Sequence, residues 1–184
     1  MKNVKKYVIL RRGEFMPYVI IGIVLLVIFI TVYQGILPKI KRKKLIQKID
    51  NYLKKIGKNY TLKVLDRDIY DVDLSIENKH FVVKILIVPD YSEIQVNSKE
   101  TWEVKYGAGD TPGKVQPHKR FLNEVSSFQK AIFPIDTTKI VLISPKPKKI
   151  VKYINECEII FVKPSTDIYG SYIATEDTFG IFLK

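Results

Sequence analysis

The sequence has 184 residues, a formal net charge of +12 and a single cysteine. One cysteine excludes an intrachain disulfide and fits a reducing compartment, and the length allows one ordinary domain besides a membrane anchor. The charge suggests a nucleic-acid partner, but ten basic residues lie within 1–16 and 39–44, which leaves 21 basic and 18 acidic residues over 45–184. Nucleic-acid binding is therefore possible, but the charge of the C-terminal part does not support it.

Residues 15–38 form a long apolar segment without a charged side chain. As an α-helix with a rise of ~1.5 Å per residue, this segment is long enough to cross the ~30 Å hydrocarbon core of a bilayer. Lys39 and the bulky Ile40 follow it, where a cleavable signal peptide has small residues. The sequence therefore predicts a single-pass membrane protein with a transmembrane helix at 15–38 and a basic N-terminal tail at 1–14.

Basic residues flank this segment on both sides. On the C-terminal side, where they can contact anionic lipid head groups, they are Lys39, Lys41, Arg42, Lys43 and Lys44. The C-terminal flank is more basic than the N-terminal one, so the positive-inside rule favours a cell-membrane protein with a cytoplasmic C-terminal domain. The opposite topology, an accessory protein on the outer surface, remains an alternative.

Residues 39–57 predict a basic juxtamembrane helix with one apolar face. Pro38 fits its first turn, and Gly57 fits its C-terminal end. Its apolar residues recur at helical spacing and are Leu45, Ile49, Tyr52, Leu53 and Ile56.

The remaining residues, 58–184, begin with a series of predicted strands. The β-rich runs are 60–65, 70–76, 81–88, 93–96 and 101–106. Turns are expected at 77–80 and 97–100. The run at 81–88 is almost wholly apolar, which is typical of a central strand covered on both faces.

Helices and strands alternate in the second half of this region. Residues 107–113 (GAGDTPG) predict a loop, and an amphipathic helix is expected to begin near Pro117. The apolar face of this helix contains Phe121, Val125, Phe128 and Ile132. Strands follow at 139–144 and 158–162, and the segment 148–155 between them is compatible with a short helix. This order favours an α+β (mixed α/β) fold with a single sheet and flanking helices.

The order of residues over 70–130 resembles the nuclease-related domain, a branch of the PD-(D/E)xK nuclease superfamily that occurs in many bacterial proteins, often beside a membrane span. The matching elements are Asp71-Val72-Asp73 on one strand, Phe81-Val82-Val83 on an apolar strand, Trp102, and Gln116-Pro117-His118 at a helix entry. The resemblance implies a restriction-endonuclease-like fold for 58–184.

The same resemblance implies a lost active site. Nucleases of this kind use two carboxylates to hold a divalent metal and a lysine to position or activate the attacking water. Where the family has the glutamate and the lysine, this sequence has Lys84 and Leu86. Asp71 and Asp73 stay candidate metal ligands, because residues two apart on a strand share a face. Acidic residues on the solvent face of an edge strand would give the same pattern.

A second arrangement spells the superfamily motif literally. Pro89-Asp90 is followed by Glu103-Val104-Lys105, which predicts an active Mg²⁺-dependent nuclease that uses Asp73 or Asp90 with Glu103 and Lys105. The predicted strand at 93–96 separates the two halves, and Glu-x-Lys triplets arise readily in a lysine-rich sequence. This active nuclease is kept as an alternative.

Other residues suggest structure rather than chemistry. His80 and His118 have no second histidine or cysteine at ligand spacing, so zinc is not predicted, and Cys157 is expected to be a small core residue. No cofactor is expected unless the nuclease alternative, with Mg²⁺, holds. The sequence thus predicts a membrane-anchored, inactive nuclease-related domain that acts as an interaction or scaffold module for an unidentified protein partner.

Overall fold

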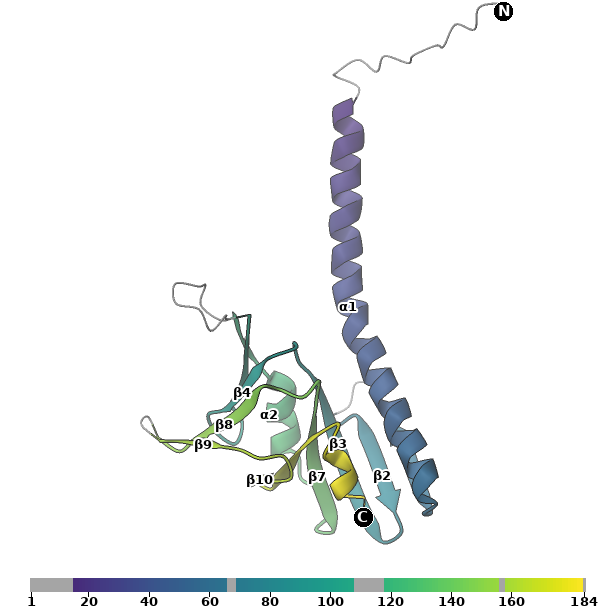
Figure 1. Ribbon diagram of the computed structural model, residues 1–184, viewed down its shortest axis with the longest axis vertical. Coiled ribbons are helices and arrows are strands. Elements are labelled where there is room, and N and C mark those ends of the chain that lie inside the picture. Colours follow the sequence, from purple (N-terminus) through teal and green to yellow (C-terminus); the bar gives the residue numbers. More distant parts are fainter. Residues whose placement is uncertain (1–14, 66–68, 108–117, 156–157, 184) are drawn as a thin grey trace, which may run out of the picture. The chain divides into compact units, whose positions relative to one another are not determined.

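The computed structural model describes residues 15–65, 69–107, 118–155 and 158–183 (Figure 1). The loop at 108–113, the helix entry at Gln116-Pro117 and Cys157 lie outside these residues. Contacts divide the chain into two units, Met1–Lys41 and Arg42–Lys184.

The first described element is a single helix, α1 (Phe15–Ile56), which has 42 residues and contains Pro38. It is the one helix in the described residues that is long and apolar enough to cross a membrane, with a mean hydropathy of 2.7 in its most apolar part. The apolar segment and the expected juxtamembrane helix are one continuous helix, so no new helix begins at Pro38. A proline inside a helix destabilises it by about 3 kcal/mol. The residues after Pro38 include several lysines and a leucine, which are strong helix formers and favour continuation of the helix.

The second unit contains a six-stranded sheet in the order β1-β2-β3-β7-β11-β10. Figure 1 labels β2, β3, β7 and β10 of this sheet. Its strands are β1 (Tyr60–Val64), β2 (Val72–Ile76), β3 (Lys79–Ile87), β7 (Thr137–Ser144), β10 (Asp167–Ile168) and β11 (Ser171–Thr175). The strands β3, β7 and β11 are parallel to one another, and the other pairs are antiparallel. The apolar β3 lies between β2 and β7 and is buried over most of its length, as predicted.

A five-stranded sheet, in the order β6-β5-β4-β8-β9, is the second layer. Its strands are β4 (Glu93–Val96), β5 (Trp102–Tyr106), β6 (His118–Phe121), β8 (Lys149–Tyr153) and β9 (Ile159–Phe161). The expectation of a single sheet is therefore wrong: β4 pairs with the distant β8 in parallel and does not return to β3. The same pairing makes β8 a strand where the sequence was compatible with a short helix.

Two apolar cores hold the second unit together. One lies between the sheets and includes Trp102, and α2 (Asn123–Lys130) packs into it through Val125 and Phe128. Two of the four predicted positions of its apolar face are wrong. Phe121 belongs to β6, and Ile132 lies beyond the end of the helix and is 96% exposed. The helix is shorter than its apolar pattern suggested.

The other core lies on the opposite face of the six-stranded sheet. Leu45, Ile49 and Leu53 of α1 are buried there, against apolar side chains of β2, β3 and β7 and of the 3-10 helix η1 (Phe179–Ile181). The predicted apolar face of residues 39–57 is thus confirmed at these three positions, whereas Tyr52 is 40% exposed. The end of α1 is an integral part of the folded domain.

Candidate functional site

A buried carboxylate with two cationic partners is the main polar feature of the second unit. Asp71, which immediately precedes β2, is 2% exposed. Its Oδ1 lies 2.9 Å from Nη1 of Arg42, and its Oδ2 lies 3.6 Å from Nζ of Lys84. The backbone N–H of Ile85 also donates to Oδ2, at 2.6 Å. We refer to Arg42, Asp71 and Lys84 as the ion cluster.

The strand register explains why Asp71 and Lys84 meet. Val72 of β2 is opposite Val83 of β3 in an antiparallel pair, and the N–H of Asp71 donates to the carbonyl of Val83. Continuing this register by one residue sets Asp71 opposite Lys84, where cross-strand side chains come within reach of each other. Lys84 is 6% exposed, so this ammonium group is also removed from water.

The electrostatics of the ion cluster disfavour a metal ion. One carboxylate and two cationic side chains carry a net charge of +1, so a divalent cation at Asp71 would be repelled by Arg42 and Lys84. Breaking a buried ion pair by removing one partner costs several kcal/mol, because the other charge stays buried without compensation. Truncating the central carboxylate is therefore expected to lower the free energy of unfolding. The cluster also links α1 to β2 and β3.

Asp73 has a separate set of partners. It lies on β2 and its Oδ1 is 2.9 Å from Nε2 of His80, whose Nδ1 is 3.0 Å from Oγ1 of Thr137. The hydroxyl of Tyr70 donates to Oδ2 of Asp73 at 3.5 Å. The edge-strand interpretation is wrong, because β2 lies between β1 and β3.

Leu86, the other position that the resemblance singled out, is a core residue with 1% exposure between the two sheets. It has no polar group to offer a metal or a water molecule. Trp102 is likewise buried in this core, and His118 lies in the exposed edge strand β6.

The literal motif is spread over the fold. Asp90 is exposed in the turn after β3, whereas Glu103 and Lys105 belong to β5 of the other sheet from Asp73. Glu103 accepts a hydrogen bond from the Asn97 side chain at 3.2 Å. No group of three or more His, Cys, Asp or Glu side chains that could hold a metal occurs among the residues that the structure describes.

A second polar group lies at the carboxyl ends of β7 and β11. The carboxylate of Glu176 accepts hydrogen bonds from Lys48 of α1, at 2.8 Å, and from Ser144. These two hydrogen bonds lower the pKa of Glu176, while burial opposes them. Sequence reasoning missed this group, although the carboxyl ends of neighbouring parallel strands are where polar residues of an open sheet commonly meet.

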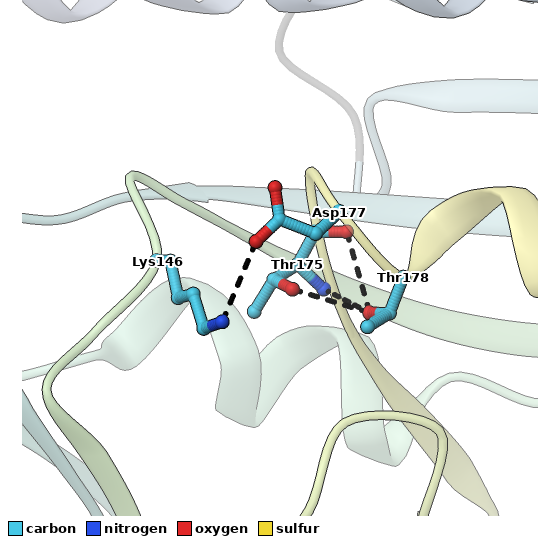
Figure 2. A network of polar contacts seen from close by, with 4 residues as sticks. All are labelled: Lys146, Thr175, Asp177 and Thr178. Atoms are coloured by element: carbon cyan, nitrogen blue, oxygen red, sulfur yellow. Dashed lines mark hydrogen bonds and ion pairs between the residues drawn. The ribbon is translucent and has the colours of Figure 1, made fainter.

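Figure 2 shows the neighbouring network around Asp177, whose Oδ2 lies 3.4 Å from Nζ of Lys146. The hydroxyl of Thr178 accepts a hydrogen bond from the backbone N–H of Thr175 at 2.9 Å, which fixes the turn after β11. A cavity of about 250 Å³ adjoins this turn. Its lining is mainly apolar and consists of Leu45, Lys48, Ile49, Tyr52, Leu142, Glu176, Asp177, Phe179 and Gly180.

The basic residues after the apolar segment differ in their surroundings. Lys39, Lys43 and Lys44 are exposed and Lys41 is half-buried. Arg42 has an internal partner in Asp71, so its guanidinium serves the fold of the second unit. Contact of the lysines with lipid head groups stays a prediction. Comparison of the chain with protein-family models, with curated proteins and with solved structures gives no match.

Proposed function

We propose that the chain is a membrane-anchored, catalytically inactive relative of the nuclease-related domain, and that it acts as an interaction or scaffold module at the membrane surface. The observation that carries this proposal is the ion cluster. Lys84 stands where the family has a metal-binding glutamate, and its ammonium group is 3.6 Å from the carboxylate of Asp71. In this proposal the ammonium group of Lys84 takes the place of the metal beside Asp71.

The order of elements supports the nuclease-related ancestry. The acidic residues at β2, the hairpin to the apolar β3, and the later α2 followed by β7 of the same sheet agree with the restriction-endonuclease-like arrangement that the resemblance implies. Loss of the second carboxylate removes the means to hold a divalent metal, and phosphodiester hydrolysis of this type depends on that metal. An inactive domain then retains its surface for binding.

The anchoring role follows from α1. This one helix contains the apolar candidate span and also the residues that are buried against the six-stranded sheet, such as Leu53. We propose that the domain is held at the cell membrane on the cytoplasmic side, since the more basic flank lies on the domain side of the span. A reporter fused after Lys184 tests this orientation; activity only outside the cell would favour the surface-protein alternative.

The purified full-length chain in detergent micelles is expected to leave single-stranded DNA, double-stranded DNA and RNA intact in the presence of Mg²⁺ or Mn²⁺. The reason is that Asp71 pairs with the cationic Arg42 and Lys84, and that the described residues contain no group of three or more His, Cys, Asp or Glu side chains that could hold a metal. Gel electrophoresis of labelled substrates measures the result. Metal-dependent cleavage that the Glu103→Ala variant abolishes would overturn the proposal and establish the active-nuclease alternative; the Glu77→Ala variant, altered at the chain's other Glu-x-Lys triplet, is the matched control.

A further inference from the structure

The edge strand β9 exposes an uninterrupted apolar surface. Ile159, Ile160 and Phe161 are 47%, 46% and 65% exposed, and the nearby Ile154 is 51% exposed. Apolar side chains on both faces of one strand are therefore open to solvent. Neighbouring apolar residues on a strand edge mark a surface that pairs with another chain.

The other edges of the two sheets are protected against such pairing. In the described residues, β1 contains Lys63, β6 contains Lys119 and Arg120, and β10 is only two residues long and includes Asp167. Charged side chains and short edge strands are common protections against edge-to-edge association. Among these four edge strands, β9 alone contains no charged residue and is at least three residues long.

The backbone of β9 has hydrogen-bonding groups directed to the open side. On the side of β8, the N–H of Ile154, just after β8, donates to the carbonyl of Glu158 at 3.0 Å, and the N–H of Val162 donates to the carbonyl of Ile150 in β8 at 2.8 Å. Because hydrogen-bonding directions alternate along an antiparallel strand, Ile159 and Phe161 direct their N–H and C=O groups away from β8. These groups are the free edge of the sheet.

We propose that β9 pairs with β9 of a second copy of this chain, antiparallel and about a two-fold axis at Ile160. In this register Ile160 is opposite Ile160 of the other copy, and Ile159 is opposite Phe161. Ile159 of each copy exchanges two backbone hydrogen bonds with Phe161 of the other copy. These bonds satisfy the N–H and C=O groups on the open side of β9. The isoleucine and phenylalanine side chains then cover one another on both faces.

The residues at the two ends of β9 favour a second copy as the partner. Glu158 precedes the strand and Lys163 follows it closely, and both are exposed. Antiparallel self-pairing sets Glu158 opposite Val162 and so brings the acidic end of each strand alongside the basic end of the other copy, whereas a parallel pairing would bring like charges together. A two-fold interface is closed, and the charged edges elsewhere oppose growth into a fibre.

Membrane anchoring also favours self-association. A helix such as α1 that spans the membrane confines two copies to the same plane and raises their effective concentration, so that a short strand interface is sufficient. The pairing does not depend on nuclease ancestry or on the ion cluster, so it can be correct even when the proposed function is wrong.

Disulfide trapping of the full-length chain in lipid vesicles tests the register. In a Cys157→Ser background, the Ile160→Cys variant is expected to form a dimer on oxidation, because directly opposed residues of this type have Cα atoms roughly 4.5 Å apart, within the range of a disulfide. The Ile159→Cys variant alone should not form a dimer, since two Ile159 residues are offset along the strands. Mixing Ile159→Cys with Phe161→Cys chains should give the mixed dimer.

The Ile160→Lys variant tests the interface without a crosslink, because it sets two like charges directly opposite each other. It is expected to weaken dimerisation roughly tenfold or more, as counted by single-molecule photobleaching in vesicles. The matched control is Ile135→Lys, at an isoleucine that is 102% exposed and outside β9, and it should leave the dimer intact. A monomeric wild-type chain, or equal crosslinking of Ile159→Cys and Ile160→Cys, overturns the proposal.

Discussion

The Asp71→Ala variant is expected to lower the free energy of unfolding by about 3–5 kcal/mol. The substitution leaves the ammonium of Lys84 buried without its carboxylate and removes the partners of Arg42 and of the Ile85 N–H. Urea unfolding of the full-length chain in detergent micelles, followed by fluorescence, measures the change. Trp102 is the single tryptophan and is 1% exposed, so its emission reports on the core of the domain.

Asp73→Ala is the matched control for this measurement. Asp73 is on the same strand, but it is only half-buried and its histidine partner is also partly exposed, so a loss of about 1 kcal/mol is expected. Combining Asp71→Ala with Lys84→Met should restore part of the stability, because no ammonium group is then buried without a counter-charge. Equal losses for the two single variants would contradict a special role for the ion cluster.

The second large effect is expected at Leu53, where replacement by alanine should cost about 2–5 kcal/mol. Leu53 is 1% exposed and belongs to the core between α1 and the six-stranded sheet, so truncation opens a cavity there. The same urea unfolding measurement applies. Lys55→Ala, on the exposed side of the helix, should change the free energy of unfolding by less than about 0.5 kcal/mol.

A small effect of Leu53→Ala, similar to that of Lys55→Ala, would mean that the end of α1 does not belong to the domain. If the effect is large, a fragment that begins after Gly57 lacks one wall of a core and should not fold. Failure of this fragment to fold would mean that the sheet needs the basic juxtamembrane part of α1 for its stability.

Local pattern predicted much of the fold. The β-rich runs at 60–65, 70–76, 81–88, 93–96 and 101–106 all contain strands, because alternation and β-branched residues are visible within a few positions. The division into two sheets was not predictable in this way. β4 pairs with β8, which lies far along the chain, and no local feature of the sequence indicates this partner.

The candidate site was predicted only in part. The resemblance pointed to Lys84, and the turn expected at 77–80 would set Asp73 opposite this lysine. The observed turn is shorter, since β3 begins at Lys79, and the register sets Asp71 opposite Lys84. A change of turn length moves every cross-strand pair, so an error of two residues in the turn changes the identity of the paired carboxylate.

Arg42 was assigned to lipid head groups together with its lysine neighbours. The sequence does hold a signal that separates it from them: Arg42 lies three and seven residues before Leu45 and Ile49, on the same face of the helix. The buried face of α1 therefore begins with a cation, for which a carboxylate of the domain is a favourable partner. Asp71 is that carboxylate.

Thermal unfolding with and without divalent metal is the most direct test of whether the ion cluster takes the place of a metal. A ligand that binds only the folded state raises the melting temperature, by an amount that grows with its concentration. The melting temperature of the full-length chain in micelles is expected to be the same in ~10 mM Mg²⁺, in ~1 mM Mn²⁺ and in EDTA, because a metal at concentrations far above its Kd would stabilise the fold by ~2.7 kcal/mol or more. A metal-induced rise that disappears in the Asp71→Asn variant would contradict this interpretation and would mean that Asp71 still holds a metal.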